Sequence, residues 1–181
     1  ISRISGVFNN NGAGVRGDMK AVIKAILMDA EARSTTVSAQ FGKQREPIIR
    51  FANLVRAFNG ASTSGRYGFA YLDSVEYGMG QGFFRSPSVF NFFDPDYAPQ
   101  GPIADAGLVA PEFQITTDTQ IIASSNVMKY LILYGIGADD ATRVNLNFSN
   151  VQSLASNPAA LVDRLDLLLT AGNLSAPTRT A

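Results

Sequence analysis

In four stretches of the sequence, apolar residues recur at the period of an amphipathic helix. These stretches predict helices over residues 18–33, 47–58, 118–134 and 158–171. In the first stretch, five apolar side chains fall on one face of the helix: Met19, Val22, Ile23, Ile26 and Leu27. We expect this face to be buried, with Lys20 and Lys24 pointing outward.

Residues that favour helix ends flank the same stretches. Asp18, either Thr116 or Thr117, and Asn157 can each cap a helix N-terminus with a side-chain oxygen. Pro47 occupies a first turn, where proline is tolerated because the N–H that it lacks would have no helical partner there. Glycines are expected to end the later helices: Gly60, Gly135 and Gly172.

The segments between these helices are long. Residues 61–82 are rich in Gly and Ser and predict a loop, while "RVNLNFSNV", residues 143–151, predicts a short strand or an extended loop. The final residues, "LSAPTRTA", are typical of the cap and first turn of another helix. We therefore predict a mainly α fold over residues 1–181, a single irregular helical domain or subdomain with long ordered loops and at most one or two short strands.

Residues 83–99, which we call the ring-rich loop, combine aromatic rings with prolines at positions 87, 95 and 99. The rings are Phe83, Phe84, Phe90, Phe92, Phe93 and Tyr97. Proline prevents a continuous helix, and successive side chains of a strand point to opposite faces. We expect an ordered loop threaded between helices, with Phe92 or Phe93 or both buried and with Asn91 bonded to loop backbone.

The alternative for the ring-rich loop is a ligand groove. In that case Tyr97 and one or two phenylalanines would stack on a sugar or a peptide. The candidate binding residues are Arg85, Asn91, Phe92, Phe93 and Tyr97. No residue is assigned a catalytic role.

The composition is apolar, and the formal charges cancel. Hydrophobic residues make up 46% of the 181 residues and charged residues 17%, with a net charge of zero. The basic residues are scattered and no aromatic platform is interleaved with them, so we expect no nucleic-acid partner. No apolar run is long enough to predict a transmembrane helix.

The sequence contains neither cysteine nor histidine. Within these residues this excludes disulfides, thiolate and imidazole metal sites, cysteine nucleophiles and histidine bases. Asp94 and Asp96 beside Asn91 offer oxygen ligands that would suit calcium, but the regular ligand spacing of a calcium loop is missing. We interpret these acids as turn residues and expect neither a metal nor a cofactor.

"GAGVRG", residues 12–17, matches the spacing of a dinucleotide-binding loop. A true site follows a buried strand, whereas "GVFNNN" precedes this one and is interpreted as a polar turn. Asp18 would also place a carboxylate where a phosphate should bind. We expect a loop that leads into the helix cap, and we attribute "RGD" at residues 16–18 to chance.

Three long segments of the sequence resemble a known protein family. "GVFNNNGAGVRGDMKAVIKAILMDAEAR", "FGKQREPIIRFANLVRAF" and "GQGFFRSPSVFNFFDPDYAPQGPIADAGLVAPEFQI" resemble the C-terminal part of bacterial proteins of the domain-of-unknown-function 1800 family. The resemblance implies a piece of a larger exported protein, found in the periplasm or outside the cell. It also implies two partners, the N-terminal region of the same protein and a protein of the domain-of-unknown-function 1501 family. No activity comes with it.

From these observations we expect a non-catalytic helical module of an exported bacterial surface or periplasmic protein that acts in a protein assembly. The alternative is one wall of the active or binding site of an enzyme that acts on a polysaccharide or another polymer. In that case the catalytic residues would lie in the N-terminal region, and Arg85, Asn91 and Tyr97 would belong to the wall.

Overall fold

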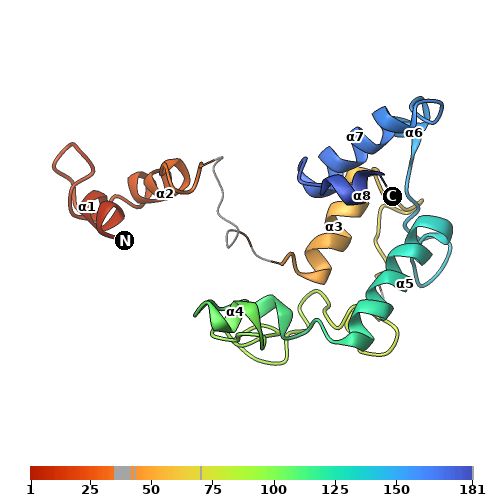
Figure 1. Ribbon diagram of the computed structural model, residues 1–181, viewed down its shortest axis with the longest axis horizontal. Helices are drawn as coiled ribbons and strands as arrows, with labels where there is room; N and C mark the ends of the chain where they lie inside the picture. Colours follow the sequence, from red (N-terminus) through yellow and green to blue (C-terminus); the bar gives the residue numbers. More distant parts are fainter. Residues whose placement is uncertain (35–41, 43, 70, 181) are drawn as a thin grey trace. The chain divides into compact units, whose positions relative to one another are not determined.

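The computed structural model of the protein describes residues 1–34, 42, 44–69 and 71–180 (Figure 1). It divides into two compact units, residues 1–42 and residues 43–181, which are considered one at a time below. Helices dominate both units and the described residues form no sheet, which confirms the mainly α fold class. The prediction of a single domain stays a prediction.

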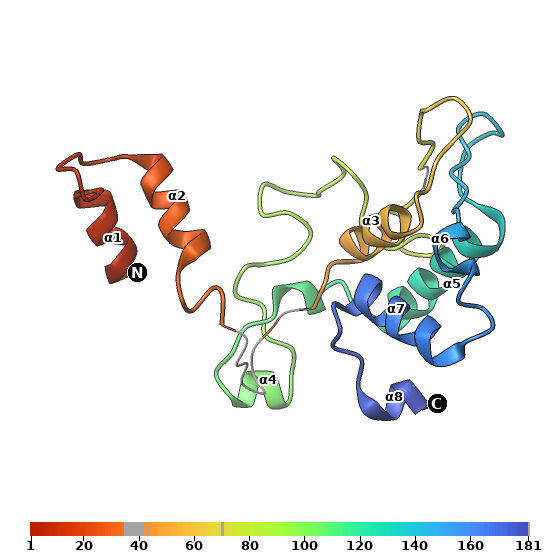
Figure 2. The same ribbon diagram turned by 90° about the horizontal axis from the view of Figure 1, so that it is seen from above.

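The first unit is a hairpin of two helices, α1 (Ser2–Asn9) and α2 (Met19–Met28), which pack side by side (Figure 2). The sequence did not predict α1, and the interpretation of "GVFNNN" as a polar turn is wrong for its first four residues, which end this helix. Arg3 on α1 donates hydrogen bonds of 2.8 and 2.7 Å to the carboxylate of Asp29 after α2. This clasp closes the open end of the hairpin.

Helix α2 differs from its prediction in length and in burial. It ends at Met28 and not at Arg33, because Asp29 takes an extended conformation in which its carboxylate accepts from Arg3 and from the backbone N–H of Glu31. On the face expected to be buried, only Val22 is buried within the unit. Four apolar residues of that face are 48% to 67% exposed: Met19, Ile23, Ile26 and Leu27. The hairpin lacks the apolar surface to cover them, since α1 is only one short helix.

The second unit is built on three longer helices, α3 (Pro47–Ala57), α5 (Asp118–Tyr134) and α7 (Pro158–Thr170). Short helical turns complete it: α4 (Pro102–Asp105), η1 (Pro111–Phe113), α6 (Ser149–Gln152) and α8 (Ala176–Thr180). The last of these confirms the helix that "LSAPTRTA" predicts.

The predicted caps of the longer helices are confirmed. The Asp18 carboxylate accepts from the N–H of Ala21 at 3.1 Å, the Thr117 hydroxyl from Gln120 at 3.3 Å and the Asn157 amide oxygen from Ala160 at 3.1 Å. Pro47 is in the first turn of α3. Helix α7 ends at Thr170, where its C-cap Ala171 and then Gly172 take left-handed φ angles of 56° and 78°.

The core of the second unit lies where α3 and α5 meet the loop between them. Five of its buried members lie in helices, namely Phe51, Leu54, Val127, Leu131 and Val151, and three lie outside them, namely Phe58, Leu72 and Met79. The ring of Phe51 meets Phe69 edge-on, with centroids 4.9 Å apart. Residues 143–151, predicted as a short strand or an extended loop, are only partly so: two isolated bridges join Val144 to Ile136 and Asn145 to Ala61, whereas residues 149–151 belong to α6. No described helix is both long and apolar enough to cross a membrane.

Candidate binding surface

The ring-rich loop lies to one side of the three long helices of the second unit (Figure 2). Phe92, Phe93 and Tyr97 are half-buried and Asn91 is exposed. The expectation that Phe92 or Phe93 is buried is therefore wrong. The physical reason is that Leu72 and Met79, from the preceding loop, already fill the core between α3 and α5.

Hydrogen bonds hold the ring-rich loop to the segment before α5. Gln114 donates its amide to the carboxylate of Asp94 at 2.9 Å and accepts from the backbone N–H of Asp94 at 2.6 Å. The N–H of Ala110 donates to the carbonyl of Tyr97 at 2.8 Å. Asn91 takes a left-handed φ of 72°, and its N–H donates to the carbonyl of Ser88. The loop is thus ordered, but by backbone and amide contacts and not by buried rings.

Arg85 lines a cavity of about 310 Å³ with Phe69, Tyr71, Leu72, Asp73, Gly82 and Phe83. Its guanidinium lies 3.6 Å from the carboxylate of Asp73, and both side chains are partly exposed. Such a pair contributes roughly 0–1 kcal/mol, so both groups remain available to a ligand. The candidate residues Asn91, Phe92, Phe93 and Tyr97 are not among those that line this cavity.

A different group of residues forms the most distinctive surface of the second unit. Four tyrosines, which we call the tyrosine surface, are 81%, 78%, 57% and 61% exposed: Tyr71, Tyr77, Tyr130 and Tyr134. The first three line a cavity of about 290 Å³ together with Asn126. Tyr130 and Tyr134 are one helical turn apart on α5, and their ring centroids are 5.1 Å apart. The sequence analysis missed this surface.

The loop over residues 71–80 presents the first two tyrosines. Tyr71 has a φ of 63°, a left-handed conformation that is unusual for a bulky residue and costs about 1–3 kcal/mol. The loop is closed by hydrogen bonds from the N–H of Met79 to the carbonyl of Leu72 at 2.7 Å and from the N–H of Gly78 to that of Ser74 at 3.0 Å. A Cβ at Gly78 would collide with the carbonyl of Tyr71, so this tight turn requires glycine.

The same loop is fastened to α5 by a buried glutamine. Gln120 donates its side-chain amide to the carbonyl of Val75 at 2.5 Å. Its amide oxygen lies beside Gly80, where a Cβ would come within 2.8 Å of it, and has no hydrogen-bond partner among the described residues. The tyrosines of the loop and those of α5 are thus held in one arrangement before any partner binds.

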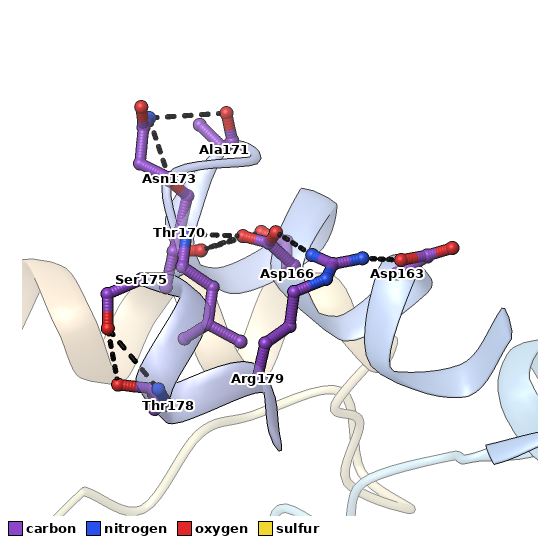
Figure 3. A network of polar contacts seen from close by, with 9 residues as sticks. Asp163, Asp166, Thr170, Ala171, Asn173, Ser175, Thr178 and Arg179 are labelled. Carbon is purple, nitrogen blue, oxygen red and sulfur yellow. Dashed lines mark hydrogen bonds and ion pairs between the residues drawn. The ribbon is translucent and has the colours of Figure 1, made fainter. Parts of the chain in front are cut away.

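A buried carboxylate near the C-terminus has a structural role (Figure 3). Asp166 on α7 accepts from the guanidinium of Arg179 at 2.8 Å, from the N–H of Leu174 at 3.0 Å and from the hydroxyl of Thr170. Arg179 also pairs with Asp163. These contacts satisfy the buried charge and hold α8 against α7, which leaves this carboxylate engaged as a structural clasp.

The glycine-rich loop of the first unit is not arranged for a phosphate. The side-chain oxygen of Asn10 accepts from the N–H groups of Gly12 and Gly14, and that of Asn11 accepts from those of Ala13 and Val15. Asn11 also donates to Asp18, which lowers the pKa of that carboxyl. The N–H groups that a phosphate would need are engaged, and the loop leads into the cap of α2 as predicted.

Among the residues that the structure describes, no three acidic side chains come together as a metal site would require. The chain matches the model of the family described as "Protein of unknown function (DUF1800)" over residues 1–181. No curated protein and no solved structure matches the chain. The chain therefore belongs to this family.

Proposed function

We propose that this member of the domain-of-unknown-function 1800 family is a non-catalytic helical module through which an exported bacterial surface or periplasmic protein joins a protein assembly. The tyrosine surface is the observation that carries the proposal. Tyrosine is enriched at the energetic centres of protein interfaces, because its ring buries a large area with little loss of side-chain freedom.

The arrangement of the tyrosine surface supports a binding role. Tyr71 keeps a strained backbone while its ring remains in water, and strain of this kind is found at binding sites where the surrounding structure compensates for it. Gln120 fixes the loop against α5, and the tight turn at Gly78 closes the loop on itself, so little ordering is needed when a partner docks. Beside Tyr130 and Tyr134, Leu133 exposes a further apolar side chain.

The partner that we propose is a protein of the domain-of-unknown-function 1501 family, following the resemblance described above. The test is co-expression of this partner with the full-length protein, followed by measurement of the mass of the complex by light scattering. Tyr77→Ser and Tyr134→Ser should weaken the complex by about tenfold or more each, as expected for interface anchors. Leu167→Ser, on α7 and as exposed as Tyr134, is the matched control and should leave the complex intact.

Two results of that experiment would overturn the proposal. One is a full-length protein that stays monomeric with this partner. The other is a complex that Tyr77→Ser and Tyr134→Ser weaken no more than Leu167→Ser does.

A second candidate function is favoured by the cavity of Arg85. A sugar-binding wall combines charged hydrogen-bonding groups with aromatic rings. This cavity offers both, in Arg85 and Asp73 and in the rings of Phe69 and Phe83. The module would then contribute one wall to an enzyme that acts on a polysaccharide or another polymer. An activity screen of the full-length protein, repeated with Arg85→Ala, Asn91→Ala and Tyr97→Ala, tests this function. Full activity in all three variants would remove these residues from the mechanism.

A further inference from the structure

An apolar groove of about 790 Å³ lies in the second unit. Helix α3 contributes Leu54, the residue that follows it is Phe58, and α7 contributes Leu161, Leu165 and Leu169. The other lining residues include Ile132 of α5 and Phe148. A volume of this size lies within the range of about 300–1,000 Å³ that small-molecule sites occupy.

The leucines of α7 explain why the groove is open. Leu161, Leu165 and Leu169 pack against the core, but each stays half-buried. The one fully buried residue of α7 is Asp166. One side of these three leucines therefore faces the groove, and an apolar occupant of the groove would shield the leucines from water.

A second cavity of about 450 Å³ adjoins the groove, and positively charged side chains line it. The two cavities share Leu54 and Leu169, and Leu54 is only 8% exposed, so it forms a floor common to both. Arg45 and Arg50 line the second cavity. No acidic side chain is among the residues that line either cavity.

The two arginines differ in their contacts. Arg45 donates to the carbonyl of Leu169 at 3.2 Å, near the C-terminal end of α7. Arg50 makes no ion pair with any residue that the structure describes, and partial desolvation lowers its pKa. An anion placed here would gain a guanidinium whose donors are not already engaged by a carboxylate.

We propose that this groove binds a single-chain amphiphile with an anionic head group, its chain against the leucines of α7 and its head at Arg45 and Arg50. Charge complementarity favours this occupant. The positive charge is confined to one end, while the other polar lining residues of the long groove are the neutral Asn147, Ser149 and Gln152. A neutral or cationic amphiphile would leave the arginines without a counter-charge.

This site is separate from the tyrosine surface, so the inference does not depend on the proposed assembly. The probes are laurate and dodecyltrimethylammonium, which have the same chain and opposite charge, used below their micellar concentrations. Equilibrium dialysis of the full-length protein should show saturable binding of one laurate, with the cation bound at least about tenfold more weakly, since Arg recognises carboxylates.

The matched variants are Arg50→Met and Arg56→Met, both on α3. Arg50→Met removes the charge and keeps an apolar stem, so laurate binding should weaken by about tenfold while the weak binding of the cation does not weaken further. Arg56→Met, which lines neither part of the groove, should bind laurate like the parent. Unchanged circular dichroism and melting temperatures establish that both variants fold.

The proposal is overturned if the folded parent does not bind laurate, or if it binds the cation as tightly as laurate. It is also overturned if Arg50→Met and Arg56→Met weaken laurate binding equally.

Discussion

The side-chain amide of Gln120, in the first turns of α5, donates a hydrogen bond to the backbone carbonyl of Val75, 45 residues earlier in the chain. This hydrogen bond ties the loop that presents Tyr71 and Tyr77 to the helix that presents Tyr130 and Tyr134, in addition to the packing of the core. The tyrosine surface therefore depends on a buried residue that a partner would never touch.

Replacing Gln120 with leucine should loosen this loop. The variant keeps the side-chain volume but leaves the Val75 carbonyl without its donor, which costs about 1–3 kcal/mol of the free energy of unfolding. A denaturant melt measures the loss, and limited proteolysis should show faster cleavage within residues 71–80. Gln100→Leu, at an exposed glutamine, is the control and should change neither. Equal effects of the two substitutions would contradict the role of Gln120.

The clasp of the first unit predicts a dependence on pH. Hydrogen bonds from Arg3 and the N–H of Glu31 lower the pKa of Asp29 from 3.8 to about 2. Because the pKa is lower in the folded state, the stabilisation is complete above pH 3.8 and is lost as the pH falls through about 2.

An NMR titration of the Asp29 carboxyl measures this directly. The parent should titrate near 2, and Arg3→Gln should move the titration of Asp29 upward toward 3.8. If Asp29 titrates at the same pH in both proteins, the clasp does not form in solution.

The two carboxylates that bind Arg179 should differ in their contributions to stability. Arg179→Met leaves Asp166 buried without its counter-charge, and because Arg179 is itself 38% exposed we expect a loss of about 1–3 kcal/mol. Asp163→Ala breaks the more exposed half of the pair and should cost less than about 1 kcal/mol. Denaturant melts of both variants provide the comparison, and an equal loss would contradict the assignment of Asp166 as the structural partner.

The burial of the rings predicts a ranking of substitutions in the second unit. Phe51→Ala empties a fully buried site and should cost about 3–5 kcal/mol. Phe92→Ala removes a half-buried ring outside the core and should cost roughly 1–2 kcal/mol, since a smaller apolar area returns to water. Denaturant midpoints test this order. If Phe92→Ala lost more of the free energy of unfolding than Phe51→Ala, the ring-rich loop would have to be part of the core.

The parts of the fold that sequence predicts well are those with local causes. Two features depend only on residues within one or two helical turns of each other. They are the apolar period of helices α3, α5 and α7 and the N-terminal caps at Asp18, Thr117 and Asn157. Helix α1 was missed because "SRISGVFN" contains serine, glycine and asparagine, which favour turns, and its partner α2 begins ten residues later.

The candidate surfaces escaped prediction for a different reason. Tyr71 and Tyr77 lie in a segment rich in glycine and serine with no regular period, and nothing in the sequence predicts the left-handed backbone of Tyr71. Their proximity to Tyr130 arises from contacts between segments far apart in the chain. The period of α5 gives no signal either: Tyr130 and Tyr134 follow Val127 by three and seven residues, which is the spacing of one helix face, yet both tyrosines are exposed.

Site-specific photo-crosslinking in living cells shows whether the tyrosine surface docks onto another protein. A photoreactive phenylalanine analogue replaces Tyr77 in the full-length protein, and the matched position is Leu167, which is also exposed, on α7. If the surface docks as proposed, the probe at position 77 crosslinks to a protein of the domain-of-unknown-function 1501 family and the probe at position 167 does not. Crosslinks from position 77 that fall only within the same chain, or equal crosslinking from both positions, would contradict the proposed docking.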